Sequence, residues 1–145
     1  MSQDLLRILH LSDLHLPLSQ AAPARSLLGK RFLGWLNLKM LRSNTHRIDA
    51  FRFLLGRVTA EKADAVVLSG DLVNLAYDFE FQQVAELMDQ AGLDPDRCML
   101  VPGNHDRYTF GADRGGAFEE GMRDWLPKGV TRGEGYPWKP DLGSV

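Results

Sequence analysis

The sequence predicts an α/β protein in which parallel strands alternate with helices. Three short apolar runs, Leu5–Leu11, Asp64–Ser69 and Cys98–Val101, have the length of buried strands. The segments between them contain apolar residues that recur with the 3.6-residue period of a helix. Polar residues suited to metal or proton chemistry follow each run directly. Because parallel strands need a crossover between them, the order β-α-β-α-β-α favours one parallel sheet.

Apolar periodicity and breaking residues define three predicted helices. The helix Ile48–Val58 has apolar residues at offsets 0, 3, 7 and 10, which place them on one face. The helix Tyr77–Ala91 has a similar apolar face and ends before Gly92, which favours a helix terminus. A short helix, Ala117–Leu126, follows the third strand and is stopped by Pro127.

Length and composition predict one domain over residues 1–145. Apolar residues make up 44% of the chain and charged residues 25%, as in ordinary globular proteins. The net charge of -2 gives no reason to expect a nucleic acid partner. The single cysteine, Cys98, cannot form an internal disulfide, and its apolar setting favours a buried hydrophobic residue over a nucleophile. With no signal peptide and no apolar segment of about 20 residues, we expect a cytoplasmic protein.

The segment 17–46 resembles an insertion, because it is apolar and basic together. Two glycines inside it weaken a helix, so we expect a broken amphipathic helix over residues 26–42. A surface for an anionic substrate or for lipid headgroups is one interpretation. A lid that packs on the domain with its cations in solvent is the interpretation we favour. Six cations without an acid between them lie in this segment or directly after it: Arg25, Lys30, Arg31, Lys39, Arg42 and Arg47.

Each predicted strand ends in groups that can bind a metal or move a proton. These groups are Asp13 and His15, then Asp71, and then Asn104, His105 and Asp106. Parallel strands bring their C-terminal ends to one edge of the sheet, where α/β proteins bind ligands. We therefore expect the six residues to meet in one cleft. Taken singly, Asn104 and Asp106 are also typical turn residues, and His105 could be a solvated surface histidine.

The residue types indicate the chemistry of the cleft. Carboxylate, imidazole and amide oxygen, without a thiolate, suit manganese, iron or zinc. Asp71 has two carboxylate oxygens and could bridge two divalent ions about 3.5–4 Å apart, which would turn a shared water into hydroxide and neutralise a phosphate ester. His105 could donate a proton to the leaving oxygen. Asp106 could hold that imidazole in its working orientation.

Three motifs resemble a known enzyme family. Asp13-Leu14-His15, Gly70-Asp71 and Gly103-Asn104-His105-Asp106 are similar to the first three motifs of the calcineurin-like metallophosphoesterases. The run that ends at His15 resembles the bacterial branch of class III cyclic-nucleotide phosphodiesterases. The resemblance implies a four-layer α/β/β/α sandwich with two metal ions and a phosphomonoester or phosphodiester substrate. It also implies that Asp13 and His15 bind one ion, Asp71 bridges both, Asn104 binds the second and His105 is catalytic.

The sequence departs from the family pattern after His105. The family continues with a further metal histidine and a Gly-His-x-His motif, whereas no histidine follows His105 here. The chain therefore resembles the N-terminal half of such a domain, with an incomplete second metal site. We expect an apolar sheet face without its partner sheet, and hence self-association. One alternative is a non-catalytic or assembly-dependent metal-binding half-domain. Another is a peripheral lipid-interacting protein that uses residues 25–47.

Overall fold

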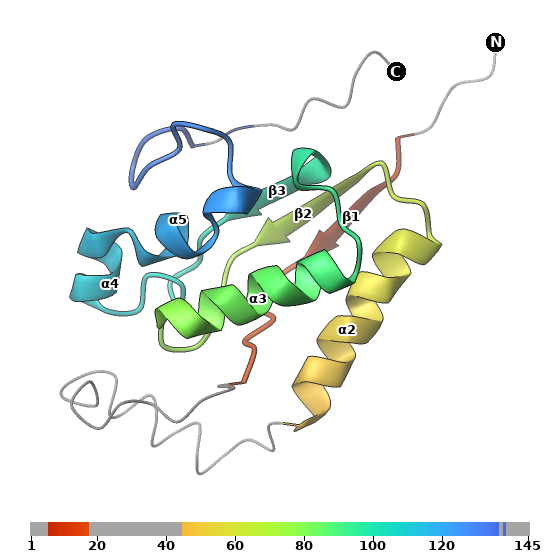
Figure 1. Ribbon diagram of the computed structural model, residues 1–145, viewed down its shortest axis with the longest axis horizontal. Coiled ribbons are helices and arrows are strands. Elements are labelled where there is room, and N and C mark those ends of the chain that lie inside the picture. Colours follow the sequence, from red (N-terminus) through yellow and green to blue (C-terminus); the bar gives the residue numbers. More distant parts are fainter. Residues whose placement is uncertain (1–5, 18–44, 137, 139–145) are drawn as a thin grey trace.

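The three predicted strands form one parallel sheet. The computed structural model describes residues 6–17, 45–136 and 138. Strands β1 (Ile8–Leu11), β2 (Ala65–Ser69) and β3 (Cys98–Val101) lie in the order β1-β2-β3, and both neighbouring pairs are parallel (Figure 1). This arrangement confirms the predicted α/β fold class. The broken helix predicted over residues 26–42 lies outside the described residues, as does most of the basic insertion.

Helices connect the strands in the predicted order. Helix α2 (Thr45–Ala60) joins β1 to β2, and it begins three residues before the predicted start. Helix α3 (Asp78–Gln90) and the 3-10 turn η2 (Pro95–Arg97) join β2 to β3. Both α2 and α3 lie on the viewer's side of the sheet in Figure 1. In the described part of the chain, no helix is long and apolar enough to cross a membrane.

The region after β3 differs from the single predicted helix Ala117–Leu126. It contains helix α4 (Phe110–Gly115), which the sequence did not indicate, then α5 (Ala117–Gly121) and the 3-10 turn η3 (Arg123–Trp125). Helix α5 packs closely on α3 at Gly121, because a Cβ there would lie 2.5 Å from Cβ and 3.0 Å from Cγ of Phe81. The ring of Phe81 also meets Phe118 edge-on, with centroids 5.8 Å apart. Close packing on α3 therefore accompanies the break in the predicted helix.

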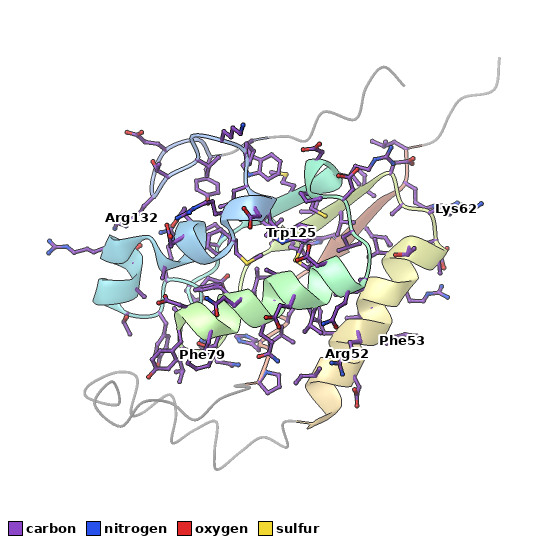
Figure 2. All side chains as sticks on the ribbon, in the orientation of Figure 1. Arg52, Phe53, Lys62, Phe79, Trp125 and Arg132 are labelled. Carbon is purple, nitrogen blue, oxygen red and sulfur yellow. The ribbon has the colours of Figure 1, made fainter. Side chains whose placement is uncertain are left out.

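The core lies between the sheet and the helices. Leu9 pairs with Val66, which pairs with Cys98, so the three side chains share one face of the sheet. Leu11, Leu68 and Leu100 form the next row of the same face. The helices cover this face with apolar side chains, and Figure 2 shows Trp125 over the sheet. The buried helical residues of this core are Phe51, Leu55, Val58, Phe81, Val84, Leu87, Met88, Ala112, Phe118 and Trp125.

The opposite face of the sheet is less well covered. Ile8 is 52% exposed and His10 is exposed, whereas their neighbours Leu9 and Leu11 are partly buried. The apolar sequence of the first strand had suggested burial on both faces. The structure shows that β1 is exposed on one of them. We call this surface the open face, and the strand residues on it are Ile8, His10, Ala65, Val67, Ser69, Met99 and Val101, of which Ala65 is buried.

Candidate metal centre

The chain segments that follow β1 and β2 remain hydrogen-bonded beyond the strands. The N–H of Asp13 donates to the carbonyl of Gly70 (3.2 Å), and that of His15 donates to the carbonyl of Asp71 (2.9 Å). Asp13, His15 and Asp71 have φ values of 55°, 44° and 54°, in the left-handed region that residues with a Cβ rarely adopt. Such strain persists only where surrounding structure enforces it, and it clusters at functional sites. Three of the predicted site residues lie in this strained backbone.

Two glycines bring the loops after β2 and β3 into contact. Gly70 has a φ of 81°, and a Cβ there would lie 2.7 Å from the Cα of Gly103. A Cβ on Gly103 would overlap the backbone and carboxylate of Asp71. Real Cβ atoms do not approach other atoms so closely, so only glycine fits at either position. The Gly-Asp and Gly-Asn-His-Asp motifs thus come into contact at Gly70 and Gly103, where the absence of a side chain leaves room for the other loop.

Three side chains converge where these loops meet. One nitrogen each from His15 and His105 and one oxygen from Asp71 lie within 4.8 Å of one another. Nε2 of His15 is 3.8 Å from Oδ2 of Asp71, and the two histidine rings meet edge-on with centroids 4.7 Å apart. The backbone N–H of His105 donates to Oδ1 of Asp71 (2.8 Å), which ties the third loop to this carboxylate.

The geometry of this group suits a divalent metal ion. Imidazole nitrogens and carboxylate oxygens bind zinc at about 2.0–2.2 Å, so two ligands of one ion lie about 3–4 Å apart. The 3.8 Å between His15 and Asp71 falls in that range and is longer than a hydrogen bond. Both side chains are largely shielded from solvent, and a carboxylate in such a place is stabilised by a nearby cation. The His-Asp-His group can therefore hold a metal.

The imidazole of His105 is held in a defined orientation. Its Nδ1 lies 3.0 Å from the backbone carbonyl of Asn74. A carbonyl oxygen only accepts, so Nδ1 carries the proton, and Nε2 is left to bind or to transfer a proton. The ring of Tyr108 stacks on this imidazole with an interplanar angle of 13° and a centroid distance of 5.3 Å. Backbone and side-chain contacts thus restrict both the tautomer and the tilt of His105.

Asp106 does not have the expected position beside the imidazole of His105. It is 1% exposed, and its two oxygens accept the N–H groups of Val73 (3.0 Å) and Gly103 (2.9 Å). Burial raises the pKa of the Asp106 carboxyl, and these two donors oppose that effect. Backbone N–H groups of the loops after β2 and β3 therefore occupy both oxygens of the carboxylate. Asp106 therefore joins the loops, and the carbonyl of Asn74 orients the imidazole instead.

The structure places the other two predicted residues at the exposed edge of the site. Asp13 is exposed and does not belong to the group of ligand atoms within 4.8 Å. Asn104 is also exposed, directly before His105. Of the six predicted residues, the structure thus brings His15, Asp71 and His105 into one close group.

Two residues that support the site were missed in the sequence. Asn74 and Glu80 are 3% and 1% exposed, and with Asp106 they are the buried polar side chains of the described residues. The side chain of Asn74 donates to the carbonyl of Leu16, next to His15. Glu80 accepts the N–H of Asn74 (3.0 Å). The available signal was the position of Glu80 in the first turn of a helix, where an acidic residue often caps backbone N–H groups.

The fold and the site together define a class of protein. Three parallel strands carry a His-Asp-His group at their C-terminal ends, as in α/β proteins that bind metal at this edge of the sheet. The family model of calcineurin-like phosphoesterases matches residues 6–143, so the chain belongs to this family of metal-dependent phosphoesterases. Neither the comparison with curated proteins nor that with solved structures gave a match.

Proposed function

We propose that the protein hydrolyses a phosphomonoester or phosphodiester with the help of bound divalent metal, either manganese, iron or zinc. The observation that supports this most directly is the close group of His15, Asp71 and His105 at the sheet edge of a calcineurin-like phosphoesterase. The donor set lacks thiolate and fits these metals. The single buried cysteine is consistent with a reducing compartment, and we extend the proposal to a cytoplasmic location.

The ligand atoms of His15, Asp71 and His105 are close enough to share one ion, but in this proposal His105 is not a metal ligand and each residue has a separate role. Asp71 and His15 would hold the metal, and Asp13 and Asn104 would supply further ligands if two ions bind. A divalent cation supplies positive charge near the phosphate and lowers the pKa of a water molecule. His105, whose Nδ1–H donates to the carbonyl of Asn74, would also carry a proton on Nε2 in its imidazolium form and would pass that proton to the leaving oxygen.

A second candidate is a metal-binding half-domain without turnover of its own. The sequence has no histidine after His105, which favours this candidate for the 145-residue chain alone. In that case the chain would bind metal but hydrolyse nothing unless a second polypeptide supplied further ligands. Hydrolysis by the isolated chain separates the two candidates.

The test uses bis-p-nitrophenyl phosphate and manganese with two variants. Asp71→Asn should lose both metal and activity, because Oδ2 of Asp71 lies near Nε2 of His15 and Oδ1 accepts the backbone N–H of His105. His105→Ala should lower turnover by about 10²–10⁴-fold while metal content stays close to that of the wild type. Asp89→Asn, an exposed position on α3, is the matched control.

Metal content is measured by elemental analysis and turnover by release of p-nitrophenol. Metal loss in His105→Ala, with retention in Asp71→Asn, would reverse the assigned roles. Metal binding without hydrolysis by the wild type would favour the non-catalytic half-domain.

A further inference from the structure

The carboxylate of Glu80 receives more hydrogen bonds than a helix cap needs. Its Oε2 accepts the N–H of Tyr77 (2.9 Å), the residue that precedes α3, which is a typical cap interaction. Oε1 of Glu80 accepts the N–H of Asn74 (3.0 Å), and Oε2 also accepts that of Leu75 (3.2 Å); both residues lie in the loop between β2 and the helix. Capping accounts for the first bond but not for the other two. A second role for Glu80 therefore concerns the loop.

The peptide group between Asn74 and Leu75 connects Glu80 to His105. Its N–H belongs to Leu75 and points at the Glu80 carboxylate, while its carbonyl belongs to Asn74 and accepts from Nδ1 of His105 at 3.0 Å. In a trans peptide these two groups point in opposite directions, so one planar unit spans the gap between carboxylate and imidazole. Glu80 thus contacts His105 through a single peptide group.

We propose that Glu80 is a positioning residue for His105, acting through the Asn74–Leu75 peptide group. A negative charge beside the N–H polarises the peptide and makes its carbonyl oxygen a stronger acceptor, because linked hydrogen bonds reinforce one another at low local dielectric. The carboxylate also fixes the direction of that carbonyl. The imidazole is then held as the Nδ1–H tautomer, and Nε2 faces the reaction. The catalytic part of this inference rests on the proposed function of His105.

Buried contacts on the other side of the loop support this arrangement. The side chain of Asn74 donates to the carbonyl of Leu16, so the residue cannot turn its carbonyl away without breaking that bond. Asn74 is 3% exposed and Glu80 is 1% exposed, so water does not replace either partner. The loop is thus fixed from both sides, and the Glu80 carboxylate accepts the N–H groups of Asn74, Leu75 and Tyr77.

The first test uses NMR of metal-free protein and does not depend on activity. Long-range ¹H–¹⁵N spectra of the wild type should show His105 with its proton on Nδ1. In Glu80→Gln, which keeps the size of the side chain but loses its charge, the Nδ1 proton should exchange with water at least tenfold faster. Glu86→Gln, an exposed position on the same helix, should leave the exchange unchanged.

A wild-type His105 with a proton on Nε2 and none on Nδ1 would overturn the proposal, and this measurement does not depend on the folding of any variant. Unchanged exchange of the Nδ1 proton in a folded Glu80→Gln would also overturn it.

The second test compares two esters with manganese-loaded enzyme. Removal of a supporting hydrogen bond behind a functional histidine typically costs 10–100-fold in activity. Glu80→Gln should show this loss on phenyl phosphate esters, whose leaving group needs a proton, and a smaller loss on p-nitrophenyl esters. Metal content should not change. Equal losses on both esters would indicate a merely structural role and would overturn the proposal. Inactivity of the wild type on both esters would refute the proposed function, and the NMR result would still decide the role of Glu80.

Discussion

Replacement of Gly70 by alanine tests the contact that joins the second and third motifs. Gly70 combines a left-handed backbone, with a φ of 81°, with a Cβ position only 2.7 Å from backbone atoms of Gly103. Gly92 at the end of α3 provides a matched control, because its φ of 69° is similar but no atom lies within 4 Å of its Cβ position. The two variants share the backbone penalty and differ in the steric overlap.

The expected free energies follow from these two contributions. A left-handed conformation costs an L-residue about 1–2 kcal/mol, and both variants should lose this amount of stability. Overpacking adds about 1–3 kcal/mol in Gly70→Ala only, because the atoms it meets belong to backbone and cannot rotate away. Gly70→Ala should therefore unfold with about 1–3 kcal/mol less free energy than Gly92→Ala, a difference of roughly 2–12 °C in Tm.

Thermal unfolding followed by circular dichroism measures both variants under the same conditions. Metal binding, measured by calorimetry, should weaken in Gly70→Ala and remain unchanged in Gly92→Ala, because only Gly70 precedes a ligand. Equal Tm values for the two alanine variants would show that the loops are not in contact at Gly70. The loops that carry Asp71 and His105 would then not be joined by this glycine contact.

Three further outcomes are expected. Burial raises the pKa of the Cys98 thiol to about 12, so only about 10⁻⁴ of it is thiolate at pH 8, and DTNB should label it no faster than the protein unfolds. Asp106→Asn should lower the free energy of unfolding by about 1–3 kcal/mol in urea titrations, since an amide can accept only one of the two buried N–H bonds; the exposed Asp124→Asn should have no effect. We also propose that the chain self-associates through the open face, so Ile8→Lys should shift it towards monomer in light scattering, whereas Phe53→Lys, on the outer side of α2 and 68% exposed, should not (Figure 2); a monomeric wild type would contradict this.

Local sequence was sufficient to predict the strands and the edge of the sheet where the site lies. Cys98–Val101 was predicted with its observed bounds, because a short apolar run is followed at once by Pro102 and Gly103. The predicted strand Asp64–Ser69 differs from β2 by one residue, whereas the predicted strand Leu5–Leu11 began too early, because β1 starts at Ile8. After each strand the extended backbone ends, and polar residues follow at the C-terminal edge of the sheet. Periodicity and breaking residues contain this information locally.

The contacts within the site could not be predicted in the same way. Asp106 was expected to orient His105 because the two are adjacent, but adjacency does not say which buried N–H groups compete for a carboxylate. Val73 and Gly103 come together only after the sheet has formed. Asn74 resembles an ordinary turn residue until its distance from His105 is known. Hydrogen bonds between residues about 30 positions apart depend on tertiary structure, which sequence spacing does not specify.

The strand order β1-β2-β3 has a consequence for how the open face can be shielded. Connections between parallel strands are right-handed in about 98% of cases. Two right-handed connections that step in the same direction across a sheet bring their helices to the same side, and a sheet gains helices on both sides only where the winding reverses. The winding does not reverse between Ile8 and Val101, so handedness alone assigns α2 and α3 to one layer. Neither α2 nor α3 can therefore cover the open face, and a layer there must be supplied by something other than these two helices.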